Sequence, residues 1–302
     1  MRRLDYPYTN LRIAPSIRCN FACTYCTHFE YQKSLIEKRK PEVEPEMWIK
    51  HLNRLNPFRP LTVIFGTGEP TQYKGISKII NSIPQWKTLL YTNASNPTLK
   101  ELRLIEPRDN FLIYVSYHPH HMKIDDFAEN SKWIKKTFKV IDFHGVKFKK
   151  NEKVLMEAKT LLAKHDIDLN LEHPLVGWFD DKFYWYDNLV QEKRFADRFA
   201  GLTDLSKRKT VLCKVSANHI AGASMVYPVG PDGSIYACWR YMLSSSNEGI
   251  LGNLFDEEFI FEDKFYECKN YGDCNICSWD NHIIDKETGR QLDIDTVDRV
   301  YV

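Results

Sequence analysis

The segment Ser16–His28 reads SIRCNFACTYCTH and carries three cysteines, Cys19, Cys23 and Cys26, in the spacing C-x3-C-x2-C. It continues from Leu11–Ile17, an apolar run whose length and composition predict a buried strand. Thiolates are strong metal ligands, and three of them within eight residues are unusual in a chain of this length. The segment therefore predicts a metal site at the end of the first strand.

Zinc and an iron–sulfur cluster are the two metal groups that this motif could bind. Structural zinc takes four ligands, and His28 could supply the fourth. Thiolates also hold iron–sulfur clusters, and three thiolates leave one iron of a four-iron cluster free for a substrate or cofactor. We favour the cluster and keep zinc as the alternative.

Beyond the first strand, helical patterns alternate with short apolar runs. Pro45–Leu55 has apolar residues at helical spacing, and Leu61–Gly66 reads as the second strand. Six strand–helix units in a row predict a parallel sheet whose right-handed crossovers curl it toward a barrel. We therefore expect an α/β fold, a partial (β/α)6 TIM-like barrel. The further predicted elements, alternately helix and strand, are 73–83, 87–93, 98–105, 111–118, 125–136, 140–148, 154–165 and 167–173.

The pattern changes after about Gly201. Met225–Trp239 reads MVYPVGPDGSIYACW, two apolar runs joined by a PDG turn, which predicts a β-hairpin. We therefore expect a barrel domain over residues 1–200 and a small α+β domain, built on this hairpin, over residues 201–302.

Composition and charge indicate an ordinary globular protein. Of the 302 residues, 43% are hydrophobic and 27% are charged, and the net charge of +2 requires neither nucleic acid nor an anionic membrane as partner. The first ten residues have no signal-peptide pattern, and no run is long enough to span a membrane. We expect a cytoplasmic protein whose eight cysteines stay reduced and serve metal binding or catalysis.

With Tyr25 before Cys26, the motif becomes C-x3-C-x-aromatic-C, which resembles the signature of the radical S-adenosylmethionine (SAM) enzyme family. The resemblance implies that Cys19, Cys23 and Cys26 hold a 4Fe–4S cluster, whose fourth iron chelates the amino and carboxylate groups of SAM. It also implies that an electron cleaves SAM to a 5′-deoxyadenosyl radical, which takes a hydrogen atom from the substrate. A low-potential donor such as flavodoxin or ferredoxin would supply the electron.

GTGEP, at Gly66–Pro70, follows the second predicted strand and resembles the GGEP motif that meets the amino group of SAM in this family. Gly66 and Gly68 let the backbone approach a ligand closely, and Glu69 offers an anionic acceptor to an ammonium group. Thr67 stands where the family motif has glycine, so the first contact is expected to differ. An ordinary glycine turn is the alternative.

Further polar or loop residues lie at the ends of later strands, where the family places contacts to the ribose, carboxylate and adenine of SAM. Such residues are also common as strand caps and turns. The candidates for cofactor binding, together with Tyr25, are Asn93, Ser116, His118, Glu172 and Val176.

A second group of cysteines contains Cys213, Cys238, Cys268, Cys274 and Cys277. The pattern G-x4-C followed by GNL and C-x5-C-x2-C resembles the SPASM/twitch extension of one radical SAM branch. Five cysteines fit the twitch form, which implies one auxiliary 4Fe–4S cluster. We favour Cys268 as the spare thiol, although it could exchange with Cys274. A spare Cys268 could donate a hydrogen atom to a substrate radical or be a buried bystander, and zinc is the alternative metal.

The resemblance implies an oxidoreductase or modifying enzyme. SPASM/twitch relatives act on peptides, small metabolites and cyclitols, so we expect a peptide or small-molecule substrate, with the auxiliary cluster accepting an electron or stabilising a lid. Eight lysines between Lys132 and Lys153 leave a nucleotide or nucleic-acid substrate open, although a solvated helix face is their commoner explanation. A zinc-stabilised nucleic-acid-binding protein without catalysis is the competing class.

Overall fold

The computed structural model describes most of the predicted barrel and part of the C-terminal third. Within the described ranges, no helix is both long and apolar enough to cross a membrane. The described residues are 8–23, 26, 41–55, 61–147, 151–172, 177–179, 182–184, 211–217, 224–237, 241–242, 247, 249–260, 266–268, 281–285 and 291–292.

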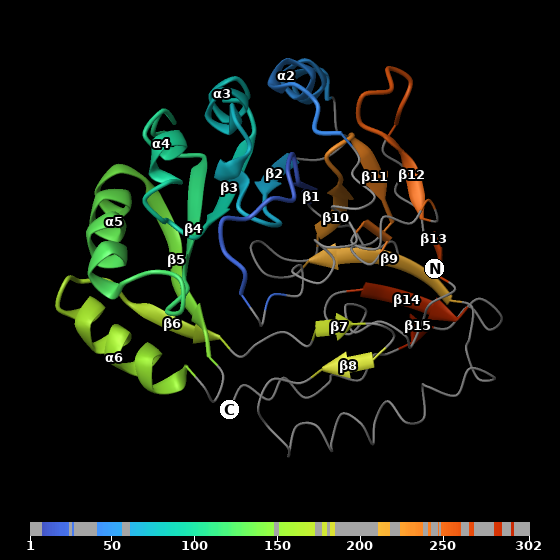
Figure 1. Cartoon of the computed structure of the whole chain (residues 1–302). Coiled ribbons are helices and arrows are strands. Elements are labelled where there is room, and N and C mark those ends of the chain that lie inside the picture. Colours follow the sequence, from blue (N-terminus) through green and yellow to red (C-terminus); the bar gives the residue numbers. More distant parts are fainter. Residues whose placement is uncertain are drawn as a thin grey trace.

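Six parallel strands pair in the order in which they follow one another along the chain (Figure 1). This confirms the predicted parallel sheet. The strands are β1 (Tyr8–Ile13), β2 (Leu61–Phe65), β3 (Lys87–Thr92), β4 (Phe111–Tyr117), β5 (Lys139–Val146) and β6 (Leu169–Glu172). The helices are α2 (Pro45–Arg54), η1 (Pro70–Gln72), α3 (Ile76–Asn81), α4 (Leu99–Leu102), α5 (Ile124–Thr137) and α6 (Glu152–Ala163).

The two faces of this sheet have different surroundings. On the outer face, Ile13 and Val63 pack in one large core with Trp48 of α2 and Phe127 of α5, all fully buried. Figure 1 shows α2 to α6 along this outer side. Fully burying an aliphatic or aromatic side chain contributes about 1.5–3 kcal/mol, so this layer holds the strand ends in place. The inner face has a smaller apolar cluster that includes Leu89.

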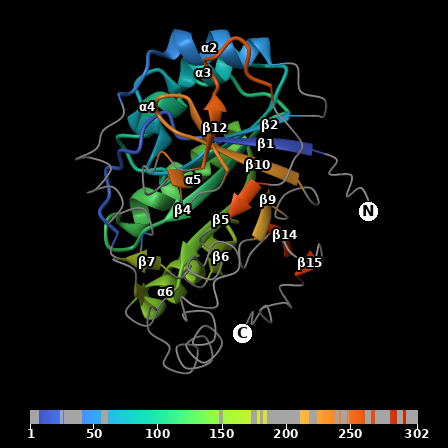
Figure 2. The ribbon, with the colours of Figure 1, turned by 90° about the vertical axis from the view of Figure 1, so that its right-hand side faces the viewer.

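The C-terminal strands continue the same sheet beyond β1. Strand β10 pairs with β1 in parallel, and β9 pairs with β10 in antiparallel orientation (Figure 2). The path runs from β15 through β14, β9, β10 and β1 to β6, an open arrangement that fits a partial barrel. The remaining strands are β7 (Gly177–Phe179), β8 (Lys182–Tyr184), β9 (Val211–Ala217), β10 (Ser224–Val229), β11 (Ser234–Tyr236), β12 (Ile250–Asn253), β13 (Tyr266–Cys268), β14 (Asn281–Asp285) and β15 (Gln291–Leu292).

The predicted hairpin is confirmed, because β10 and β11 are antiparallel neighbours. Gly233 has φ +79° in its turn, a backbone conformation that glycine adopts without steric cost. The Asp232 carboxylate accepts hydrogen bonds from the backbone N–H of Ser234 at 3.1 Å and from its hydroxyl at 2.9 Å. The division into domains near residue 200 stays a prediction, since strand pairing joins both sides of that boundary.

Candidate functional site

The motif-bearing loops gather at the carboxyl ends of the parallel strands. The cysteine loop (residues 16–26) follows β1, the GTGEP loop (residues 66–70) follows β2, Asn93 follows β3 and His118 follows β4. Loops at this end of neighbouring parallel strands come together in space, which is why α/β barrels place their active sites there. The sequence prediction of one shared site at this end is therefore consistent with the topology.

The three cysteines of the cysteine loop form no disulfide, and Cys23 and Cys26 are near enough to Cys19 for their charges to affect it. Cys23 is buried, while Cys19 and Cys26 are half-buried. The N–H of Cys26 donates to the carbonyl of Cys23 at 3.0 Å, and the N–H of Phe21 donates to Cys19 Sγ at 3.4 Å. A backbone hydrogen bond therefore links the second and third cysteine directly.

Electrostatics at these thiols favour a bound cation. Burial, with a smaller contribution from the nearby charges of Glu69, Cys26 and Cys23, raises the pKa of Cys19 to about 12, although the hydrogen bond from the Phe21 N–H opposes the rise. A thiolate without a cation is therefore unfavourable here, whereas metal coordination deprotonates a thiol outright. Three soft thiol donors in one loop, one buried and two half-buried, fit an iron–sulfur cluster. Within the described ranges, no three His, Cys, Asp or Glu side chains are grouped to hold a single metal ion.

The GTGEP loop lies directly against the cysteine loop. The N–H of Glu69 donates to the carbonyl of Arg18 at 2.9 Å. A Cβ atom at Gly68 would lie 2.5 Å from the carbonyl oxygen of Arg18 and 2.7 Å from that of Ile17, and Gly68 has φ +60°. Only glycine permits both this backbone conformation and this close approach. The second glycine of GTGEP is thus required to bring the two loops together.

The carboxylate of Glu69 organises the loop from inside. Its side chain is buried, and Oε1 accepts hydrogen bonds from the Thr71 N–H at 3.2 Å, the Thr71 hydroxyl at 2.7 Å and the Thr92 hydroxyl at 3.0 Å. Oε2 accepts one from the Asn93 N–H at 2.7 Å. Burial raises the pKa of Glu69, and these hydrogen bonds oppose that rise. Oε2 accepts one hydrogen bond from the described residues and has a lone pair for a second, which a ligand ammonium could donate.

Thr67 carries two unfavourable features at once. Its φ is +80°, a left-handed conformation that a β-branched residue rarely adopts. Its hydroxyl is buried without a hydrogen-bond partner in the described part of the chain. Strained backbone and unsatisfied polar groups concentrate at functional sites. The residue that departs from the family motif is therefore the strained one.

Asn93 connects the end of β3 to the cysteine loop. Its Nδ2 donates to Asn20 Oδ1 at 2.9 Å, and Asn20 Nδ2 donates to Ser95 Oγ at 2.9 Å. The Ser95 N–H closes the network by donating to Asn93 Oδ1 at 3.0 Å. The sequence analysis identified Asn93 but missed Asn20 and Ser95. The position of Asn20 between two motif cysteines was the available signal.

Ser116 and His118 contact different groups. The Ser116 hydroxyl lies 2.9 Å from His144 Nε2, whereas His118 Nδ1 lies 3.4 Å from Cys23 Sγ. Burial lowers the pKa of His118 to about 3 and that of His144 to about 4, so both rings are neutral at pH 7. His118 is thus beside the cysteine loop, while Ser116 belongs to the inner face of the sheet. Their predicted contacts to SAM stay predictions.

A row of aromatic and polar side chains crosses the inner face next to the GTGEP loop. The Arg12 guanidinium lies 5.2 Å from the ring centre of Tyr91, and a Cβ at Gly66 would lie 3.3 Å from Arg12 Nε. The rings of Tyr91 and Tyr114 are 4.8 Å apart, and those of Tyr114 and His144 are 4.2 Å apart. The sequence analysis missed these residues, although polar residues alternating with apolar ones along a strand could have indicated them.

The remaining candidate residues lie in later strands or outside the described residues. Cys213 lies in β9 and Cys268 in β13, two neighbouring antiparallel strands in which Cys213 is paired with Tyr266 and Cys268 with Val211. Glu172 is the last residue of β6. The predicted site residues outside the described ranges are Tyr25, Val176, Cys238, Cys274 and Cys277.

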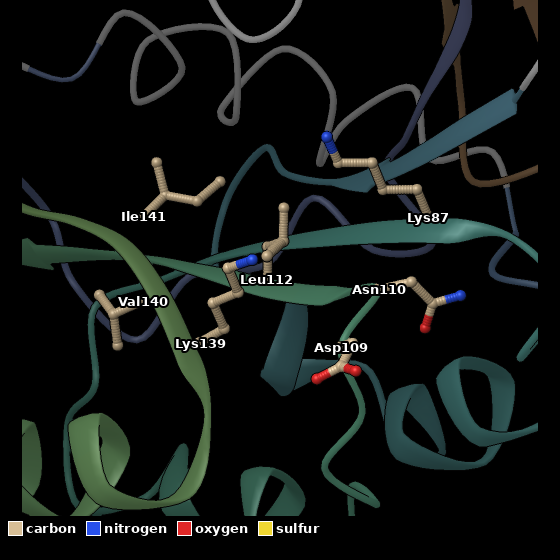
Figure 3. A pocket seen from close by; sticks show the side chains of 7 residues that line it. All are labelled: Lys87, Asp109, Asn110, Leu112, Lys139, Val140 and Ile141. Carbon is tan, nitrogen blue, oxygen red and sulfur yellow. The ribbon is translucent and has the colours of Figure 1, made fainter.

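A surface pocket lies at the opposite, amino-terminal ends of β3, β4 and β5 (Figure 3). It has none of the motif residues in its lining, so it is separate from the candidate site. Its lining residues are Lys87, Asp109, Asn110, Leu112, Lys139, Val140 and Ile141.

Comparisons with known proteins find similarity in structure. No protein-family model and no curated protein matches the chain. Streptococcus suis SuiB bound to S-adenosylmethionine has a TM-score of 0.55 at 15% identity, over 84% of this chain and 64% of SuiB. SuiB bound to the precursor peptide SuiA has a TM-score of 0.53 with the same identity and coverage. The protein anSMEcpe with bound AdoMet and the Cp18Cys peptide has a TM-score of 0.50 at 18% identity, over 83% of this chain and 78% of anSMEcpe.

These identities are low, so the likeness concerns the fold. The chain spans about 64% of the length of SuiB. It has the fold expected from its resemblance to radical SAM enzymes with a SPASM/twitch extension, a partial α/β barrel followed by further strands.

Proposed function

We propose that this chain is a radical SAM enzyme that cleaves S-adenosylmethionine and abstracts a hydrogen atom from a peptide substrate. The contact between the GTGEP and cysteine loops carries the proposal. Glu69 N–H binds the Arg18 carbonyl, and Gly68 has no room for a Cβ against that loop. The contact brings a three-thiol loop and a buried carboxylate together at the end of the sheet where barrel active sites form.

The residues of the chain would divide the work as follows. Cys19, Cys23 and Cys26 would hold three irons of a 4Fe–4S cluster. Glu69 Oε2 would accept a hydrogen bond from the ammonium group of SAM, because it accepts one protein N–H and has a second acceptor position. Gly68 would let the backbone come near that group. When bound, the cluster and SAM supply the reductive cleavage and the organic radical; the protein supplies orientation and exclusion of other reactions.

A peptide is the substrate class that the comparisons favour. Two similar structures are described as peptide complexes, SuiB with SuiA and anSMEcpe with Cp18Cys. The inner-face row of Arg12, Tyr91, Tyr114 and His144 offers charge, ring faces and hydrogen-bonding groups that could orient a peptide. A small metabolite is the second candidate, and a reduced flavodoxin or ferredoxin in the cytoplasm would be the electron donor.

An auxiliary 4Fe–4S cluster would be bound by the C-terminal cysteines, with Cys213, Cys238, Cys274 and Cys277 as the favoured ligands. The register of β9 and β13 supports an exchange in which Cys268 replaces Cys274, because it places positions 213 and 268 on neighbouring strands. Zinc is the alternative metal for these thiols. The iron content of the protein separates the two possibilities.

The lysine-rich stretch gives little support to the nucleic-acid alternative. Lys132 pairs with Glu129 at 2.7 Å, and Lys147 pairs with Glu152 at 3.2 Å. Lys135 also forms an ion pair, with Asp166 at 2.5 Å. Lysines with carboxylate partners are typical of a solvated surface, where such pairs contribute little to stability.

Anaerobic reconstitution with iron and sulfide tests the proposal. The wild-type protein should be brown, bind about eight iron and eight sulfide per chain, and release 5′-deoxyadenosine from SAM when it is reduced. A Cys23→Ala variant should release none, while Leu104→Ala, at an exposed position of the outer layer, should behave as wild type. A colourless protein that binds only zinc would contradict the proposal.

A further inference from the structure

His118 lies against the sulfur of a predicted cluster ligand. Its Nδ1 is 3.4 Å from Cys23 Sγ, although the two residues are 95 positions apart in the chain. Hydrogen bonds to sulfur are longer than those to oxygen, so this separation is a hydrogen-bonding distance. Cys23 is buried, which shields the contact from water. The structure therefore gives this thiol a side-chain partner that the motif alone does not provide.

The backbone and the ring of His118 are each held by neighbouring residues. The N–H groups of His121 and Met122 donate to the His118 carbonyl at 3.0 and 3.1 Å, which closes a turn directly after β4. The ring of Phe21, from the cysteine loop, meets the His118 ring edge-on at 5.5 Å. The same Phe21 ring stacks on His121 at 5.0 Å. The contact with Cys23 thus belongs to a packed arrangement between two loops.

The chemistry of the contact depends on which group donates. When Cys23 binds iron it is a thiolate, which has no proton and can only accept a hydrogen bond. An imidazole N–H is then the donor, and the tautomer with the proton on Nδ1 is required. Hydrogen bonds to ligand sulfurs are among the factors that set the reduction potential of an iron–sulfur cluster. They favour the reduced state because it carries more negative charge.

We propose that His118 is a positioning residue that donates a hydrogen bond from Nδ1 to the Cys23 thiolate and thereby raises the reduction potential of the cluster. This inference rests on the proposed function, since it requires that Cys23 hold a cluster. It assigns His118 to the cysteine ligand, whereas the sequence analysis assigned it to SAM. With this bond, an electron donor of less negative potential would suffice to reduce the cluster.

Three variants separate the hydrogen bond from packing. His118→Leu removes the donor, and His118→Asn retains an N–H near the position of Nδ1. His121→Leu is the matched control, because His121 also stacks on Phe21 and lies in the same turn, but no hydrogen bond joins it to the Cys23 sulfur in the described part of the chain. The readout is the midpoint potential of the cluster held by Cys19, Cys23 and Cys26. It is followed by electron paramagnetic resonance without SAM or substrate.

We expect a lower midpoint potential in His118→Leu, a potential near wild type in His118→Asn, and no shift in His121→Leu. An unshifted potential in His118→Leu, or an equal shift in His121→Leu, would overturn the inference. A second measurement needs no variant: wild-type protein with ¹⁵N-labelled histidine should show a ¹⁵N coupling to the reduced cluster in pulsed resonance spectra. Absence of this coupling would also overturn it. A wild-type protein that assembles no cluster would instead refute the proposed function itself.

Discussion

The cysteine loop and the GTGEP loop meet at the same end of the sheet, but they are held in place differently. The GTGEP loop is fixed from within by the buried carboxylate of Glu69, which binds the backbone or side chains of Thr71, Thr92 and Asn93. The cysteine loop is fixed by its neighbours, with contacts from Glu69, from Asn93 and from His118. The cysteine loop therefore takes its position from the GTGEP loop, which forms a preorganised platform beside it.

The largest effect is expected where the two loops touch. Gly68→Ala places a Cβ 2.5 Å from the Arg18 carbonyl at φ +60°, so the loops must separate. We expect a loss of stability of about 3 kcal/mol and failure to assemble the first cluster, measured by denaturant unfolding and iron content. Gly66→Ala is the control, because its nearest neighbour is the Arg12 side chain at 3.3 Å, which can move. Equal losses of stability and of iron content in the two variants would contradict the inference that the GTGEP loop positions the cysteine loop.

The second effect concerns the platform's carboxylate. Glu69→Gln removes the charge and replaces one acceptor oxygen with an amide donor, which cannot accept hydrogen bonds from both Thr71 and Asn93 in the native arrangement. We expect SAM affinity to fall by about thirtyfold, or about 2 kcal/mol, measured by equilibrium binding to the reconstituted protein. Glu101→Gln is the matched control, since the Glu101 carboxylate accepts hydrogen bonds from Ser77 between the outer helices α3 and α4. Unchanged SAM affinity in Glu69→Gln would argue against an ammonium contact.

A smaller effect is expected from the tether between β3 and the cysteine loop. Asn20→Ala removes the side chain that joins Asn93 to Ser95. The lost hydrogen bonds should weaken SAM binding by about 1 kcal/mol, or about fivefold, while the metal-free protein stays folded. Asn53→Ala, which removes a hydrogen bond to the Ser82 carbonyl on the outer layer, should leave binding unchanged. Equal losses of SAM affinity in both variants would show that the effect comes from a general loss of stability and not from the lost contact with the cysteine loop.

The smallest effect tests the strain at Thr67. Thr67→Gly relieves the φ of +80° and removes the unsatisfied hydroxyl, so the unfolding free energy of the metal-free protein should rise by about 1 kcal/mol. Thr67→Val keeps the branched shape and the strain, so it should be less stable than Thr67→Gly. Denaturant unfolding of both variants measures the difference. A glycine variant less stable than wild type would show that Thr67 is not strained.

The sequence predicted the parts of this arrangement that depend on local pattern. The strand–helix alternation to Glu172 and the hairpin near Gly233 follow from apolar periodicity and turn residues, and the structure confirms both. The parallel pairing of β10 with β1 was not predicted, because strand periodicity does not identify a distant partner. The contact of His118 with Cys23 was not predicted for a similar reason, since it depends on how two loops pack across the end of the sheet.

Resonance spectroscopy of the reduced protein with SAM that carries ¹⁵N in its amino group tests the central claim most directly. If Cys19, Cys23 and Cys26 hold three irons and the fourth binds SAM, the spectrum should show a ¹⁵N coupling that disappears when unlabelled SAM replaces it. A reduced four-iron cluster in the wild-type protein without that coupling would contradict the claim.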